Sequence, residues 1–449
     1  MVLGFMKKEI TNKVLWLFAI GQLGWSILSG IISSWLVFYY TDIDGVLYKY
    51  ITQGAVFIGL TIIGLITAFG RVFDAVTDPL IAGISDASKN PKGRRIPFMK
   101  IIAVPFALVT ALIFILPCTG ITWLNNTLLF ALLILFYLFM TIYCTPYNAL
   151  ISELGNNQKN RVNVSTFISL TYIVGLSLSY LVPNIASLFE GLVGAENSVK
   201  LAIGLLSLVA AIAMLIPGFT IKESDYIDVV PCKTTPMRSL LKTFKNKQFR
   251  RFVYSDVIYF FAVTLFQTGL AFYVTKLMKV DEGNTFILTV IMTVISLLLY
   301  LPVNKLAPKF GKKKLVIFGF LTYTAVFILT SFCGEGLVWG IIIAVFAAVP
   351  MAILGILPQA IVADIAEADS LKTGEKREGM FFASRTFAFK LGQALSLLVF
   401  TSIVASGSEM SYRITAIVAA ACCFIGAMLL LLYNEKSIME IINEKGKIK

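Results

Sequence analysis

The chain has 449 residues, of which 58% are hydrophobic and only 14% are charged, and its mean hydropathy is +0.85. Soluble domains are about 45–50% apolar and about 25% charged, so this composition excludes an ordinary soluble protein and predicts an integral membrane protein. The chain contains no histidine, which excludes imidazole proton relays and histidine-ligated metals.

Twelve apolar segments follow one another, each near or above the ~20 residues that a membrane-spanning helix needs. They cover residues 14–40, 54–85, 98–118, 126–152, 164–188, 199–221, 252–275, 285–307, 314–333, 336–363, 380–406 and 411–433. The longest hydrophilic stretch lies after the sixth segment. The sequence therefore predicts an N-terminal six-helix bundle (1–221), a cytoplasmic linker (222–251), a C-terminal six-helix bundle (252–433) and a cytoplasmic tail (434–449). We expect an all-α membrane protein with twelve transmembrane helices, organised like the major facilitator transporters.

The net charge of +13 is distributed unevenly. If the N-terminus is cytoplasmic, three of the 38 Lys and Arg residues fall within helices, and of the rest only five lie on the outer side of the membrane. The outer five are Lys49, Lys200, Lys276, Lys279 and Arg413. This asymmetry predicts that both termini are cytoplasmic and that the basic charge sets topology, so we expect no nucleic-acid partner. Gly93 and Gly311 each precede a cationic run that is followed by a new apolar helix. This matched pair of loops further indicates an internal repeat.

The second segment carries Arg71, Asp74 and Asp78 in the run GRVFDAVTDPL. Spacings of three and four residues place these side chains on one helix face. A charge at membrane depth costs about 2.5–3.5 kcal/mol on insertion scales and usually marks an ion or substrate pathway. Two carboxylates can share a cation, or one can hold a proton because the other raises its pKa. Pro79 also frees the carbonyl of Ala75 as an oxygen ligand. The alternative is a structural ion pair between Arg71, as charge partner, and an aspartate.

Several stretches carry a resemblance to a known family: GQLGWSILSG…FYYTD, GRVFDAVTDPLIAGISD…GRRIPF, TPYNALISEL and ADIAEADSLKTGEKREGMFFASRTFAFKLG. They resemble the glycoside–pentoside–hexuronide:cation symporters, the melibiose permease-like branch of the major facilitator superfamily. The resemblance implies a site for Na+, H+ or Li+ and a substrate-proximal lysine at Lys390. The implied cation ligands are Asp74, Thr77, Asp78 and Thr141. The family's sugar-binding positions fall on Trp25, Ser26, Cys144, Asn148 and Ser169, where its charged ligands are missing.

The eleventh segment adds two intramembrane cations, Arg385 and Lys390. They are five residues apart, or about 140° around the helix, so both cannot point squarely into one cavity. We expect one to pair with an aspartate of the second helix and the other to meet substrate, and the sequence leaves open which does which. We expect Asp256, early in the seventh helix, to be interfacial. Five charged residues are predicted to form a cytoplasmic gate: Asp86, Arg94, Arg95, Asp364 and Glu367.

These features predict a secondary active transporter that couples Na+ or H+ to uptake of a glycoside, oligosaccharide or sugar acid by alternating access. The alternative is transport, inward or outward, of a less polar solute such as a lipid, steroid or other amphiphile. The chain shows no paired nucleophile and base, no metal-ligand spacing and no nucleotide loop, so we expect neither an enzyme nor a cofactor. We further expect a monomer in a bacterial plasma membrane.

Overall fold

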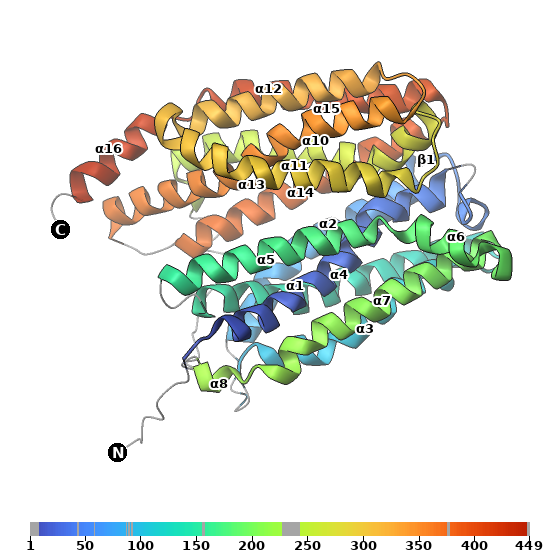
Figure 1. Ribbon diagram of the computed structural model, residues 1–449, viewed down its shortest axis with the longest axis horizontal. Coiled ribbons are helices and arrows are strands. Elements are labelled where there is room, and N and C mark those ends of the chain that lie inside the picture. Colours follow the sequence, from blue (N-terminus) through green and yellow to red (C-terminus); the bar gives the residue numbers. More distant parts are fainter. Residues whose placement is uncertain are drawn as a thin grey trace. The chain divides into compact units, whose positions relative to one another are not determined.

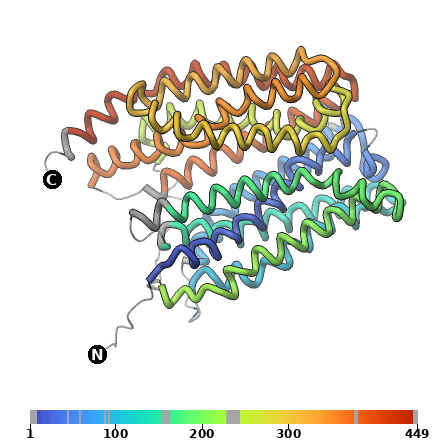
Figure 2. Tube along the Cα trace, viewed as in Figure 1, coloured from blue at the N-terminus to red at the C-terminus, as the bar shows by residue number. Residues whose placement is uncertain are grey.

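The computed structural model describes residues 9–42, 45–57, 59–86, 88, 90, 93–154, 158–226, 243–374 and 378–446 (Figures 1 and 2). The chain forms two compact units. The N-terminal unit comprises residues 1–40, 44–52 and 76–235, and the C-terminal unit comprises residues 41–43, 53–75 and 236–449. Helix α2 (Ile62–Asp86) contributes its first half to the C-terminal unit and its second half to the N-terminal unit.

The N-terminal unit is helical. Besides the second half of α2, its elements are α1 (Asn12–Thr41), η1 (Tyr48–Tyr50), α3 (Ile96–Ile115), α4 (Thr122–Leu154), α5 (Gln158–Ser179), α6 (Val182–Val193), α7 (Ala195–Thr220) and α8 (Glu223–Tyr226). Helix α3 packs along both α4 and α7. Glycines let the backbones approach closely, as is typical of helix packing in membranes. A Cβ atom at Gly24 of α1 would lie 2.5 Å from the carbonyl oxygen of Ala210 in α7.

The C-terminal unit has the same helical character. Besides the first half of α2, its elements are β1 (Ala55–Phe57), β2 (Leu60–Thr61), α10 (Lys247–Phe272), the π-turn η2 (Tyr273–Leu277), α11 (Asn284–Phe310), α12 (Lys312–Ser331), α13 (Leu337–Thr373), α14 (Glu378–Val404), α15 (Glu409–Leu430) and α16 (Glu435–Gly446). Strands β1 and β2 pair antiparallel just before α2. Helix α10 packs against α14 and α15, and α12 packs against α13 and α15, as Figure 1 shows.

Eleven spans in the described residues are long and apolar enough to cross a membrane. Helix α2 is not among them, although its 25 residues reach the required length. Its hydropathy is interrupted by Arg71, Asp74 and Asp78. A helix of this length that retains three charges within a bundle of apolar spans is the natural place to look for function.

The same capping arrangement occurs once in each unit. In the N-terminal unit, Oε2 of Glu223 accepts hydrogen bonds from the backbone N–H groups of Arg95 and Ile96, at 2.8 and 3.2 Å, where α3 begins. In the C-terminal unit, the carboxylate of Glu435 accepts from the backbone N–H groups of Lys312 and Lys313, at 2.8 and 3.1 Å, where α12 begins. A carboxylate at a helix N-terminus satisfies orphan donors and complements the helix dipole.

A glycine precedes each capped helix. Gly93 has φ +128° and Gly311 has φ +86°. A Cβ atom at Gly93 would lie 2.4 Å from Oε2 of Glu223, and one at Gly311 would lie 2.9 Å from Oε2 of Glu435. The two glycines singled out in the sequence therefore occupy matching positions, with a left-handed backbone and no room for a side chain.

Replacing Glu435 by alanine should lower the stability of the C-terminal unit by about 0.5–2 kcal/mol, the range for loss of a helix N-cap. The effect arises because two backbone donors lose their carboxylate acceptor. The thermal unfolding midpoint of the detergent-solubilised protein measures it. Glu440→Ala, an exposed glutamate on the same helix α16, is the matched control and should leave the midpoint unchanged. Equal midpoints for the two variants would contradict the capping role.

Candidate functional site

Asp74 is completely buried and lies in an ion pair with Lys390. Oδ2 of Asp74 is 2.8 Å from Nζ of Lys390 on α14, and both residues belong to the C-terminal unit. Arg71, one turn earlier on α2, is the expected charge partner, but its Nη1 is 4.0 Å from the same oxygen. Of the two basic residues of α14, Lys390 is therefore the one that reaches the second helix. At this depth each charge is tolerated because the other compensates it.

Asp78 belongs to a different cluster, which lies in the N-terminal unit and is rich in hydroxyl groups. Its Oδ1 is 3.5 Å from Oγ1 of Thr145, and Oγ1 of Thr77 is 3.3 Å from Oγ1 of Thr141. Thr141 and Thr145 are one turn apart on α4, so they present adjacent hydroxyls toward α2. Oxygen atoms are the ligands that hard cations prefer. Thr145 was not predicted from the sequence, although its spacing of four residues from Thr141 would have pointed to it.

Arg385 forms a second buried ion pair in the C-terminal unit. Its Nε and Nη2 donate to the two carboxylate oxygens of Asp256 on α10, at 2.7 and 2.9 Å. Asp256 is only 2% exposed, and its place at the membrane interface stays a prediction. The rings of Phe260 and Phe389 flank the guanidinium, at 5.6 and 5.9 Å from their centroids. A bidentate pair between aromatic rings locks α10 to α14.

The residues at the family's sugar-binding positions have varied surroundings in the N-terminal unit. Ser26 is buried and donates a hydrogen bond to the carbonyl of Gln22, 2.6 Å away on its own helix. Trp25 lies against Tyr172 of α5, with ring centroids 6.1 Å apart, and its buried Nε1 has no hydrogen-bond partner among the described residues. The other three positions are Cys144, which is half-buried, and Asn148 and Ser169, which are exposed. Their role in binding substrate stays a prediction.

Among the predicted cytoplasmic gate residues, Arg95 and Asp364 form polar contacts within their own units. Arg94 and Arg95 are buried beside the Glu223 cap. Asp364 of α13 forms an ion pair with Lys312 at the start of α12, and Glu367 is exposed. The side chain of Asp86 lies outside the described residues. The gate itself stays a prediction.

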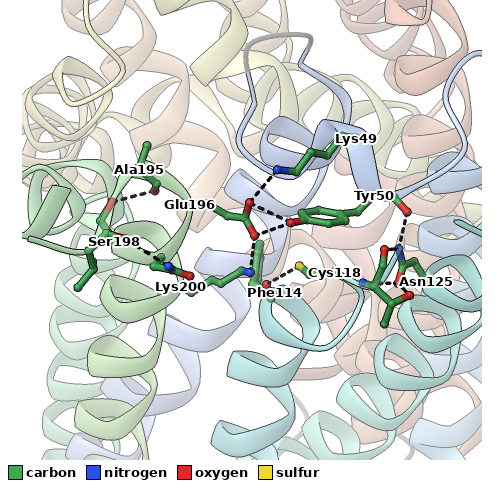
Figure 3. Close-up of polar contacts among 12 residues, drawn as sticks. Lys49, Tyr50, Phe114, Cys118, Asn125, Ala195, Glu196, Ser198 and Lys200 are labelled. Carbon is green, nitrogen blue, oxygen red and sulfur yellow. Dashed lines mark hydrogen bonds and ion pairs between the residues drawn. The ribbon is translucent and has the colours of Figure 1, made fainter. Parts of the chain in front are cut away.

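The basic residues assigned to the outer side contact acidic side chains or carbonyl groups within their own units. In the N-terminal unit, the carboxylate of Glu196 accepts from Nζ of Lys200 at 2.7 Å, lies 3.1 Å from Nζ of Lys49, and accepts from the hydroxyl of Tyr50 at 2.8 Å (Figure 3). The hydrogen bond and the negative charge of Glu196 raise the pKa of Lys49. Asn125 of α4 donates to the carbonyl of Tyr50 at 2.8 Å, so the η1 segment is fastened to both α4 and α7 (Figure 3).

The C-terminal unit has its own set of such contacts. Lys276 pairs with buried Asp42 at 2.7 Å. Lys279 pairs with Glu335, and Arg413 donates to the carbonyl of Ser331 at 2.7 Å. The side of the membrane on which the five basic residues lie stays a prediction.

Apolar spans surrounding paired charges at membrane depth define a multi-pass membrane transporter. The family model described as MFS/sugar transport protein matches residues 17–435, and the chain belongs to this family of transporters. The match confirms the predicted resemblance and the major facilitator fold. It also places the protein among transporters rather than enzymes, and implies a small-molecule substrate.

Relatives of known name agree with this assignment. An uncharacterised symporter of Synechocystis is 23% identical, over 89% of this chain and 86% of its own length. A protein of Escherichia coli K12 named as a candidate sulfoquinovose importer is 25% identical, over 87% and 80%. The sodium-dependent lysophosphatidylcholine symporter 1 of Xenopus tropicalis is 23% identical, over 74% and 70%. Among solved structures, one of a proton-dependent oligopeptide transporter superimposes with a TM-score of 0.69 at 10% identity, covering 97% of this chain and all of that one, which reflects the shared fold.

Proposed function

We propose that this protein is a cation-coupled symporter that uses a Na+ or H+ gradient to take up a sugar, glycoside or sugar acid by alternating access. The observation that carries the proposal is the buried ion pair between Asp74 and Lys390, one helical turn from the hydroxyl-lined Asp78. A transporter that must respond to a cation needs a carboxylate whose partner can be exchanged, and Asp74 has such a partner. We keep the four predicted residues as the proposed cation ligands, because Asp74 offers a carboxylate with an exchangeable partner and Asp78, Thr77 and Thr141 of the N-terminal unit offer oxygen atoms.

The ion pair suggests how coupling works. In the structure, the ammonium group of Lys390 neutralises Asp74. An arriving Na+ or H+ brings a positive charge of its own to the aspartates of α2, so it competes with that ammonium. Once released, Lys390 can donate hydrogen bonds to a hydroxyl or carboxylate of the substrate. Cation and substrate then stabilise the same state, which is the thermodynamic requirement for symport.

The name of a relative supports a sugar as the substrate, because the Escherichia coli protein is named for sulfoquinovose, a sulfonated sugar. The alternative is an amphiphile. It is supported by the uncharged residues at the sugar-binding positions and by the relative named for lysophosphatidylcholine. We further propose a monomer, because one chain carries every proposed ligand. The bacterial relatives support a bacterial plasma membrane, and the distribution of basic residues along the sequence supports cytoplasmic termini.

Uptake into proteoliposomes tests the proposal. The panel contains methyl β-glucoside, glucuronate, sulfoquinovose and lysophosphatidylcholine, each with an inward Na+ gradient, with an inward H+ gradient and with neither. We expect one of the three sugars to accumulate under one gradient only, and Asp78→Asn to remove that accumulation. Accumulation of lysophosphatidylcholine alone would establish the alternative. Sugar accumulation that persists without either gradient would contradict cation coupling.

A further inference from the structure

The exposed face of α13 changes its chemistry halfway along the helix. In the first half the exposed side chains are large and apolar, such as Val338, Val345 and Phe346, which are 68%, 40% and 55% exposed. In the second half the exposed positions are Gly355, Gln359, Ala363 and Glu367. Their spacing of four residues places them on one face of the helix.

The two halves therefore suit different surroundings. The apolar half suits hydrocarbon. A glutamine amide does not, because a polar group transferred to an apolar medium without hydrogen bonds is strongly disfavoured. Gly355 is nine residues, or about 14 Å, from Asp364, which pairs with Lys312 where α12 begins. Since the hydrocarbon core is ~30 Å thick, a membrane boundary near Asp364 would put Gly355 close to the middle of the core, where this exposed polar face of α13 suits an aqueous passage better than lipid.

Tyr300 of α11 reaches the same point. A Cβ atom at Gly355 would lie 3.1 Å from the hydroxyl oxygen of Tyr300, and among the described residues its only other neighbour within 4 Å would be the adjacent ring carbon, at 3.9 Å. Helix α11 packs along α13, so this approach is part of a regular helix contact. The missing side chain of Gly355 thus leaves an open space beside a phenol group, and Gln359 lies one turn further along the same face.

We infer that Tyr300, Gly355 and Gln359 form a substrate subsite in the C-terminal unit that takes the hydroxyl groups of a sugar ring. The glutamine amide both donates and accepts hydrogen bonds, and so does the phenol hydroxyl. Gly355 is exposed and adds no side chain of its own beside these groups, so they stay accessible to the ring. The subsite itself contains no charged side chain, so it suits the neutral part of the substrate. The inference rests on the proposed transport of a sugar and names residues that would recognise it.

Water access to the subsite can be tested without knowing the substrate. In a variant whose six cysteines are replaced, Gln359→Cys and Gly355→Cys are treated with a membrane-impermeant, positively charged methanethiosulfonate reagent from either side of membrane vesicles. Val345→Cys, on the exposed apolar half of the same helix, is the matched control. We expect labelling at residues 355 and 359 and none at residue 345. If Gln359→Cys were as unreactive as Val345→Cys from both sides, the subsite would not exist.

Substrate recognition is tested by protection and by affinity. Methyl β-glucoside, glucuronate and sulfoquinovose should each be tried as protectants, and at least one should slow labelling of Gln359→Cys. For that sugar, Gln359→Leu and Tyr300→Phe should each weaken the apparent affinity about 2- to 10-fold, as expected for the loss of one or two neutral hydrogen bonds. The exposed Lys305→Met variant should leave it unchanged.

The outcomes separate this inference from the proposed function. Labelling that only lysophosphatidylcholine prevents would overturn the sugar subsite while leaving the coupling proposal open to its own test. Sugar accumulation that depends on Asp78 but is insensitive to Gln359→Leu, Tyr300→Phe and Gly355→Val would overturn the subsite and leave symport intact.

Discussion

Replacing Asp74 by asparagine is expected to abolish cation-driven accumulation and also to destabilise the protein. Lys390 would then be a buried ammonium without its carboxylate, and removing one partner of a buried ion pair typically costs about 3–5 kcal/mol. Accumulation is lost because the cation no longer finds a carboxylate whose partner it can displace. Uptake into proteoliposomes and the thermal midpoint in detergent measure the two effects separately.

A second substitution separates these effects. In Asp74→Asn/Lys390→Met neither charge remains, so the midpoint should return most of the way to the wild-type value while accumulation stays absent. Asp281→Asn, an exposed aspartate in the loop before α11, is the matched control and should change neither measurement. Full accumulation by the stable double variant would show that the pair between Asp74 and Lys390 is only structural.

Replacing Arg385 by methionine is expected to lower stability by a similar amount, about 3–5 kcal/mol, because Asp256 would be left buried and uncompensated. Here, however, we expect the damage to be structural. Both carboxylate oxygens of Asp256 already accept from the guanidinium, so Arg385 has fewer donors available for substrate. Arg385→Lys should recover only part of the stability, because an ammonium group cannot reproduce the bidentate geometry.

A double variant in which stability is restored distinguishes the role of Arg385 from that of Lys390. The double variant Asp256→Asn/Arg385→Gln, which keeps polar groups of similar size, should regain stability and transport together. A stable double variant that no longer transports would assign Arg385 to the substrate site, one of the two roles that the sequence left open for it. Melting curves and uptake assays on the same preparations decide between these roles.

The class of protein could be predicted from composition and periodicity because a membrane imposes a simple rule on sequence. Each span must be long and apolar, so α1, α3 and the later spans are visible as long runs with few charges. The same rule explains why α2 stands out, since its three charges are costly where they lie. Gly93 and Gly311 were also recognisable, because a left-handed backbone at the start of a helix selects glycine.

The partners of the charged residues were not predictable in the same way. Arg385 and Lys390 are separated by only five residues on one helix, and each could have paired with an acid of α2. Which one does so depends on the rotation of α14 against α2 and α10. Glu223 and Glu435 were missed for the same reason, because each caps a helix that is more than 120 residues away in the chain.

By itself, the amino-acid sequence determined that this is a helical membrane transporter with three charges on its second helix, α2. Hydropathy and helical spacing are local properties that every window of the chain carries. Only the tertiary structure decided that Lys390 neutralises Asp74, that Asp256 holds Arg385, and that Tyr300 meets the open space at Gly355. Such pairings depend on how helices distant in sequence are rotated and packed, and no local pattern encodes them.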